Sequence, residues 1–293
     1  MSSVNEPSGE VTIVGWDGSP EAQVAIEWAA RRAARRGGSL DILTVSEDNP
    51  DGPIAEHAAE ALRHEFPGLL IRSETISGDP VDVFARRSEP GQTLVFGTRR
   101  DSAPHFRFTW NFGGRLVEEA RGPVIIVPQD HETPQHGILV GVDESRESQE
   151  AVRFAADEAR SAGTSLDIVH AWLGPIASPI PGFNVEKAPW MVDAHKRVIA
   201  TAAAIAHEVS PSLRTVTHVD VELASHSLVN RARQASMVVV GARGRGHLAA
   251  LAFGSVSTTL LSAMPCPVVI LGPNAVAAPS GAAASVVVGA QHS

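Results

Sequence analysis

The 293-residue chain contains a single cysteine and no tyrosine, and none of its apolar runs is long enough to cross a membrane. Cys266 by itself excludes an intrachain disulfide and a metal site built from several thiolates, which favours a reducing compartment. A membrane-spanning helix needs about 18 or more consecutive apolar residues, so the sequence predicts none. Residues 1–10 are polar and lack the basic and apolar segments of a signal peptide, so we expect a cytoplasmic protein.

Basic side chains are also scarce. The 24 lysines and arginines are outnumbered by 33 aspartates and glutamates, which gives a formal net charge of −9. Binding to nucleic acid or to anionic membranes relies on basic patches, so we expect neither kind of partner. Hydrophobic residues make up 43% of the chain, which excludes wholesale disorder. At about 150 residues per domain, the length predicts two domains.

The second half of the sequence repeats the first. Early segments return at an offset of 126 residues and later ones at an offset of 144. A period of this size is too long for a solenoid unit and indicates a duplicated domain. The matching segments are 11–19 with 137–145, 39–43 with 165–169, 94–97 with 238–241, and 122–127 with 266–271.

The repeats predict two tandem copies of one domain. We call residues 11–128 the first copy and residues 137–272 the second copy. The polar segment 129–136 is the predicted linker between them. We expect residues 1–10 to be flexible and most of the alanine-rich tail, 273–293, to be disordered.

Within each copy, short apolar segments alternate with amphipathic ones. The apolar segments are rich in Val, Ile and Leu, as buried parallel strands are, and helical patterns such as 21–36 and 149–161 lie between them. Right-handed crossovers then give an α/β fold of two tandem, doubly wound, Rossmann-like domains with five-stranded parallel sheets. The predicted strands are 11–16, 39–45, 69–76, 92–97 and 123–127, then 137–142, 164–172, 215–222, 236–241 and 266–271.

A glycine motif follows the fourth predicted strand of the second copy. Gly241, Gly244, Gly254 and Ser255 have the spacing G-x2-G-x9-G-S. Glycines allow sharp turns and close approach of the backbone to a ligand, and Ser255 is a candidate N-cap for the next helix. The start of a helix offers free N–H groups to a phosphate. A glycine-rich turn without any ligand is the alternative.

This motif resembles the ATP-binding signature of the universal stress protein family. The Val-Gly-x-Asp segments at 14–17 and 140–143 and the segment 264–269 resemble the same family. The resemblance covers both copies and implies a tandem two-domain member with an adenine nucleotide alpha hydrolase-like fold. It also implies that the two copies pack together as a pseudo-dimer and that whole chains form homodimers.

The resemblance assigns roles to positions of the second copy. Ser255 would also lie near a divalent ion, Mg²⁺, bound with ATP. For Asp143 the residues alone favour a turn formed with Ser145. The implied contacts are adenine for Asp143 and the backbone of Ala171, ribose for Gly241, and phosphates for Gly244, Gly254 and Ser255.

The first copy departs from this pattern. Arg100 replaces the second glycine, twelve residues separate it from Gly113, and Gly114 stands in place of the serine. The intervening segment 101–112 contains four bulky aromatic residues, which we expect in a loop. The first copy is therefore a weaker site, a site that binds without ordering a triphosphate, or a structural partner. The residues of this weaker site are Asp17, Val45, Gly97 and Gly113.

The sequence lacks the signatures of several enzyme classes. No P-loop lysine, G-x-G-x-x-G turn, G-x-S-x-G elbow or H-E-x-x-H zinc motif is present. We therefore expect an ATP-binding regulatory sensor or switch of the stress response that is read by an unknown regulatory protein, and not an enzyme. Two alternatives stay open: a protein-interaction module with vestigial sites, and a slow ATP-hydrolysing enzyme.

Overall fold

The computed structural model describes residues 9–46, 54–99, 106–130, 136–173, 189–242 and 253–275. The strands are β1 (Val11–Gly15), β2 (Ser39–Val45), β3 (Leu70–Ile76), β4 (Gln92–Thr98), β5 (Val124–Pro128), β6 (His136–Gly141), β7 (Leu166–Ala171), β8 (Thr215–Asp220), β9 (Ala235–Gly241) and β10 (Val268–Leu271). The helices are α1 (Pro20–Arg36), α2 (Ile54–Glu65), α3 (Pro80–Arg87), α4 (Phe106–Glu119), α5 (Arg146–Ala162), α6 (Pro189–Val209), α7 (Ala224–Ala232) and α8 (Ser255–Ala263), followed by the 3₁₀ turn η2 (Pro273–Ala275).

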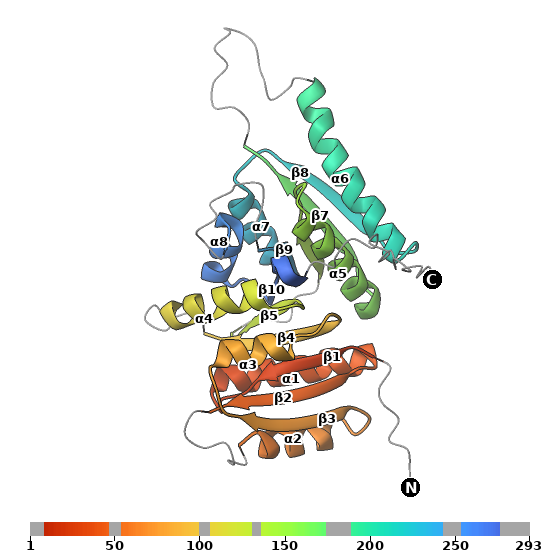
Figure 1. The fold of residues 1–293 in the computed structure, drawn as a ribbon. Helices are drawn as coiled ribbons and strands as arrows, with labels where there is room; N and C mark the ends of the chain where they lie inside the picture. The colour runs from red at the N-terminus through yellow and green to blue at the C-terminus, as the bar shows by residue number, and fades with distance from the viewer. Residues whose placement is uncertain are drawn as a thin grey trace, which may run out of the picture.

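All ten strands belong to one sheet, in the order β3-β2-β1-β4-β5-β10-β9-β6-β7-β8 (Figure 1). Each copy contributes five parallel strands, and the order reverses beside its first strand. The two halves meet where β5 pairs with β10 in antiparallel register, with Ile125 opposite Val269. The predicted doubly wound α/β fold is confirmed, and the two copies pack against each other along this pair of strands.

Helices cover both faces of the sheet because the buried strand residues alternate between two cores. Val14 and Val140, both 0% exposed, lie in the core shared with α1, α2, α5 and α6. Their neighbours Ile13 and Leu139 lie in the core beneath α3, α4, α7 and α8. The near-continuous apolar strands of the sequence are therefore explained by burial on both faces.

The first helix of each copy is built in the same way. Ser19 caps α1 by accepting a hydrogen bond from the N–H of Ala22, and Gly37 ends the helix at φ 64°. In the second copy Ser145 caps α5 and Gly163, also at φ 64°, ends it. A left-handed residue at this position favours glycine, so the sequence fixes both ends of these helices.

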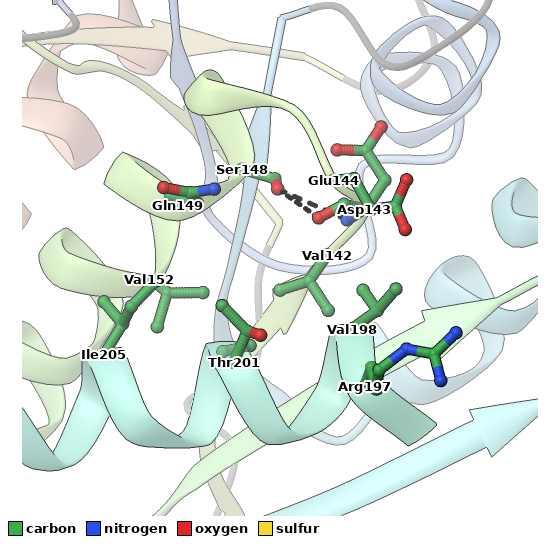
Figure 2. A pocket seen from close by; sticks show the side chains of 11 residues that line it. Val142, Asp143, Glu144, Ser148, Gln149, Val152, Arg197, Val198, Thr201 and Ile205 are labelled. Atoms are coloured by element: carbon green, nitrogen blue, oxygen red, sulfur yellow. Dashed lines mark hydrogen bonds between the residues drawn. The ribbon is translucent and has the colours of Figure 1, made fainter. Parts of the chain in front are cut away.

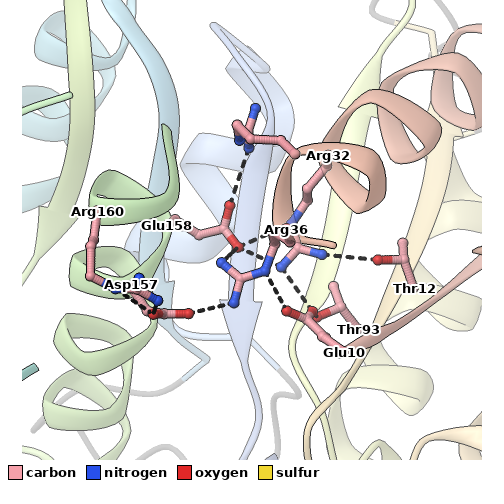
Figure 3. Close-up of polar contacts among 9 residues, drawn as sticks. Glu10, Thr12, Arg32, Arg36, Thr93, Asp157, Glu158 and Arg160 are labelled. Carbon is pink, nitrogen blue, oxygen red and sulfur yellow. Dashed lines mark hydrogen bonds and ion pairs between the residues drawn. The ribbon is translucent and has the colours of Figure 1, made fainter. Parts of the chain in front are cut away.

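A buried ionic cluster joins the two copies where α1 approaches α5 (Figure 3). Arg32 on α1 is 1% exposed and donates to Oε1 of Glu158 on α5, which is 0% exposed, from Nε at 3.0 Å and Nη2 at 2.5 Å. Arg36 lies 3.0 Å from the same carboxylate and also pairs with Glu10 and Asp157. Arg32 and Glu158 are 126 residues apart, so they occupy the same position of the repeat with opposite charges.

Candidate functional site

A cavity of about 370 Å³ opens where β6, β7 and β9 end. Ligands of doubly wound sheets bind at the carboxyl ends of strands beside the point where strand order reverses, and β6 is the strand at that point here. The walls come from the ends of these strands and from α5, α6, α7 and the start of α8. A volume of this size lies within the range of small-molecule sites.

The structure brings most of the predicted residues of the second copy together. Asp143, Ala171, Gly241, Gly254 and Ser255 all line this cavity. Gly244 lies outside the described residues. Because the five come from three strand ends and one helix start, only the fold makes them neighbours.

The start of α8 forms one end of the cavity. Gly254 occupies the N-cap position with φ −71° and ψ 168°, and no side chain caps the helix. The expectation that Ser255 would be the N-cap is therefore wrong: Ser255 is the first helical residue, because Gly254 carries the extended backbone that precedes the helix. The Ser257 hydroxyl does not cap the helix either, since its Oγ donates to the carbonyls of Ala242 and Gly254, both at 3.1 Å.

Gly241 is required by packing. A Cβ atom at this position would lie 2.8 Å from the Cβ of Glu147 and 3.3 Å from the backbone nitrogen of Ser148. Real Cβ atoms essentially never approach as closely as the first of these distances. The end of β9 thus presses against the first turn of α5, which explains this glycine independently of a ribose contact.

Asp143 forms the turn that the residues alone favoured. Its Oδ1 accepts hydrogen bonds from the backbone N–H of Ser145 at 2.8 Å and from the Ser145 hydroxyl at 2.5 Å. The Ser148 hydroxyl in turn donates to the Asp143 carbonyl at 2.8 Å. These bonds fix Asp143 in the wall of the cavity, and its contact with adenine stays a prediction.

A smaller cavity of about 210 Å³ lies beside the first, between α5 and α6. It shares Val142, Asp143 and Ser148 with the larger cavity. In Figure 2, Val198 and Ile205 of α6 lie opposite the α5 side of the pocket. The two cavities therefore adjoin at the three residues that they share, and both apolar and polar side chains line the smaller one.

The sequence analysis gave no role to three aromatic residues of the cavity wall: His170, Trp172 and His195. His170 Nδ1 lies 2.8 Å from the Val142 carbonyl oxygen, and its Nε2 lies 2.8 Å from Nδ1 of His195. The His195 ring stacks on Trp172, with 4.1 Å between ring centroids and 19° between planes. His195 is 25 residues from its partner, so no local motif could have identified it.

The corresponding region of the first copy is filled by phenylalanine rings. Phe84 and Phe96 occupy the positions of Leu228 and Val240, which line the cavity in the second copy. The two rings meet edge to face at 4.8 Å, and Phe96 meets Phe112 at 5.3 Å. Aromatic packing thus takes the place of an open pocket wall.

The expected aromatic loop at 101–112 is wrong in its second half, because α4 already begins at Phe106. Gly113 consequently lies buried inside this helix, where its N–H belongs to the helix interior and is not available to a phosphate. The other residues of the weaker site lie at or near the ends of β1, β2 and β4. Asp17 makes the same turn as Asp143 by accepting from the Ser19 N–H at 2.9 Å, Val45 ends β2, and Gly97 packs against α1.

Two further findings concern the described residues alone. They contain no cluster of three or more His, Cys, Asp or Glu side chains that could hold a metal ion. None of their helices combines the length and the apolar character needed to cross a bilayer.

The sequence model of the universal stress protein family matches residues 11–128 and 136–272. The universal stress protein Rv2623 of Mycobacterium tuberculosis is 29% identical, over 92% of this chain and 98% of its own. Rv1996 of the same organism is 27% identical, over 88% of this chain and 93% of its own.

Solved structures share the fold. A universal stress protein from Archaeoglobus fulgidus superposes with a TM-score of 0.61 at 17% identity, covering 90% of this chain and 99% of its own. The protein PA1789 from Pseudomonas aeruginosa, described as functionally unknown, reaches a TM-score of 0.64 at 16% identity, covering 94% and 96%.

Proposed function

Since the chain belongs to the universal stress protein family, we propose that its second copy binds an adenine nucleotide, ATP with Mg²⁺, and that the bound nucleotide switches the protein in a stress response. The observation that carries the proposal is the uncapped start of α8 at the edge of the cavity. The first N–H groups of a helix have no partner within it, and the helix dipole favours an anion there. Phosphates satisfy both requirements.

The remaining wall suits the rest of a nucleotide. Phosphates at Ser255 would lie beyond the end of β9, and a base near Ala171 would lie beyond the end of β7. The strand β6 lies between β9 and β7, so the ends of β9 and β7 are about 10 Å apart. An extended nucleotide spans such a distance between its base and its phosphates.

The donor set fits a magnesium ion that enters with the nucleotide. Mg²⁺ keeps several waters and takes most other ligands from phosphates, with one or two protein oxygens. The Ser255 hydroxyl would supply such an oxygen, and the described residues offer no protein-only metal site that would compete. When bound, the ion neutralises phosphate charge.

A contact between the copies supports the regulatory part of the proposal. Phe253 directly precedes Gly254, is 3% exposed, and reaches the α4 helix of the first copy at Gly113. A ligand at the start of α8 therefore acts one residue from the interface. It shifts the equilibrium between two arrangements of the copies by the difference between its binding free energies for those arrangements. A cytoplasmic location, a homodimer and a regulatory protein that reads the bound state belong to this proposal.

The first test is to purify the protein, denature it and identify any released nucleotide by chromatography. The second is to titrate folded, ligand-free protein with ATP and Mg²⁺ by calorimetry. Bound ATP that is recovered intact supports the switch. Accumulation of ADP indicates the slow ATP-hydrolysing alternative. Absence of binding at millimolar ATP overturns the proposal in favour of an interaction module with vestigial sites.

A further inference from the structure

Three rings lie together at the end of the cavity formed by β7 and α6. His170 belongs to β7, Trp172 follows it, and His195 reaches over from α6. His195 stacks on Trp172 at 4.1 Å, and its ring lies 5.0 Å from that of His170 with 29° between planes. The cavity thus has an aromatic wall at the end opposite the start of α8.

The hydrogen bonds of this cluster fix its geometry. The Val142 carbonyl can only accept, so Nδ1 of His170 carries the proton in their 2.8 Å bond. In the uncharged pair, Nε2 of His170 must then accept from Nδ1–H of His195, again at 2.8 Å. His170 is 7% exposed and cannot turn freely, so it holds the His195 ring flat against Trp172.

The first copy lacks all three rings. Thr44 and Ser46 occupy the positions of His170 and Trp172. The helices α2 and α6 end at equivalent positions, because the N–H groups of Phe66 and Ser210 make the same backbone hydrogen bond after each helix. The 21-residue α6 is therefore longer than the 12-residue α2 at its start, which is the part that carries His195. The aromatic wall therefore occurs in the copy with the intact glycine motif.

We propose that the Trp172–His195 pair is the stacking surface for the base of the bound nucleotide, that it selects purine over pyrimidine nucleotides by ring area, and that His170 is its positioning residue. This inference rests on the proposed function and goes beyond it. Stacking on aromatic side chains tolerates any base, because every base has a π-face, and it grows with the overlapping area. The surface therefore favours ATP and GTP alike over CTP.

The experiment compares ATP, GTP, CTP and inorganic tripolyphosphate, each with Mg²⁺, by calorimetry on the full chain. Trp172→Ala and His195→Ala should each weaken ATP and GTP about tenfold, weaken CTP less, and leave tripolyphosphate unchanged. His195→Phe keeps a stacking ring and should retain most of the purine preference. His218→Ala is the matched control, since His218 is a half-buried histidine of β8 outside the cavity.

His170 needs a readout that a merely structural role would not change. His170→Ala should lower the ratio of ATP to tripolyphosphate affinity. His170→Gln should restore part of that ratio, because its amide oxygen can accept from Nδ1–H of His195. Thermal melts establish that each variant is folded.

The outcomes separate the two proposals. If the wild type binds ATP but Trp172→Ala and His195→Ala leave the ratio of ATP to tripolyphosphate affinity unchanged, the stacking inference is overturned and nucleotide binding stands. Equal weakening of all four ligands also overturns it, because the cluster then only supports the fold. If the wild type binds none of the four, both proposals fail.

Discussion

The two copies share a frame and differ in what lies at the ends of their strands. Both begin with a strand, an aspartate turn and a helix capped by serine and glycine. In the second copy Leu228 and Val240 leave a cavity beside the start of α8. In the first copy Phe84 and Phe96 fill the corresponding place. The two candidate sites thus differ in the volume of a few side chains and in where one helix begins.

The largest effect is expected from Gly254→Glu. Gly254 has φ −71° and ψ 168°, an extended conformation that any residue adopts, so the fold should persist. The new carboxylate would face the phosphates, and juxtaposed like charges cost several kcal/mol, so ATP affinity should fall about 100-fold or more. Calorimetry measures the change.

Gly113→Ala is the matched variant of the first copy. Within the part of the chain that the structure describes, its Cβ would meet only Phe253, at an ordinary 4.0 Å, so ATP affinity should stay unchanged. Equal losses from Gly254→Glu and Gly113→Ala would show that the two copies contribute alike and that the comparison is mistaken.

The next effect concerns Arg32 and Glu158, which carry opposite charges at the same position of the two copies. Glu158→Ala leaves the buried guanidinium of Arg32 without its main partner, which should lower the free energy of unfolding by about 3–5 kcal/mol. Urea unfolding measures it. Arg31→Ala is the control, because Arg31 is an exposed neighbour on α1 whose ion pair with Glu27 should contribute less than about 1 kcal/mol. Similar losses in both variants would contradict a special role for the buried pair.

A third experiment gives the first copy the residues of the second. The double variant Phe84→Leu, Phe96→Val removes the volume of one buried and one partly buried ring, so the free energy of unfolding should fall by roughly 2–4 kcal/mol. It should not add a second ATP site, because Gly113 stays inside α4. Calorimetric stoichiometry decides: two ATP per chain would show that the rings alone block the first copy.

The sequence predicted the fold well because the strands are short and apolar and recur in both copies, and the central ones, such as β5 and β10, are buried on both faces. Five residues singled out from the sequence, Asp143, Ala171, Gly241, Gly254 and Ser255, line one cavity in the structure. Asp143, Ala171 and Gly241 lie at or just after strand ends, which are readable from apolar patterns, and Gly254 precedes a helix start.

The misses have physical causes. The sequence analysis matched Gly113 to Gly254 because both are glycines. In the structure the ends of α4 and α8 are the equivalent positions, since Leu116 and Leu260 are both 0% exposed and 144 positions apart. His195 was missed because its partner lies on another element, and only the approach of α6 to β7 brings them together. Helix register and contacts between distant elements are set by tertiary packing, which a local pattern does not contain.

The smallest effect compares one carboxylate of each copy. Burial raises the pKa of Asp41 on β2 and the Glu74 carboxylate raises it further, while the cations Arg72, at 3.8 Å, and Arg87 do not cancel these effects. Burial also favours a raised pKa for Asp220 of β8. Hydrogen bonds from Arg231 and Ser227 outweigh this effect and hold the pKa of Asp220 below its ordinary value. The charged form is therefore unfavourable at Asp41 and favourable at Asp220.

At pH 7, Asp41→Asn should raise the free energy of unfolding and Asp220→Asn should lower it, each by less than about 1 kcal/mol. The gain in the free energy of unfolding from Asp41→Asn fades as the pH falls from the raised pKa of Asp41 towards the ordinary value of 3.8. The loss at Asp220 persists over that range and fades only below 3.8, towards the depressed pKa. Urea unfolding of both variants and the wild type along an acid series should therefore show the Asp41 difference disappearing first. The reverse order would mean that the two carboxylates do not differ as their surroundings require.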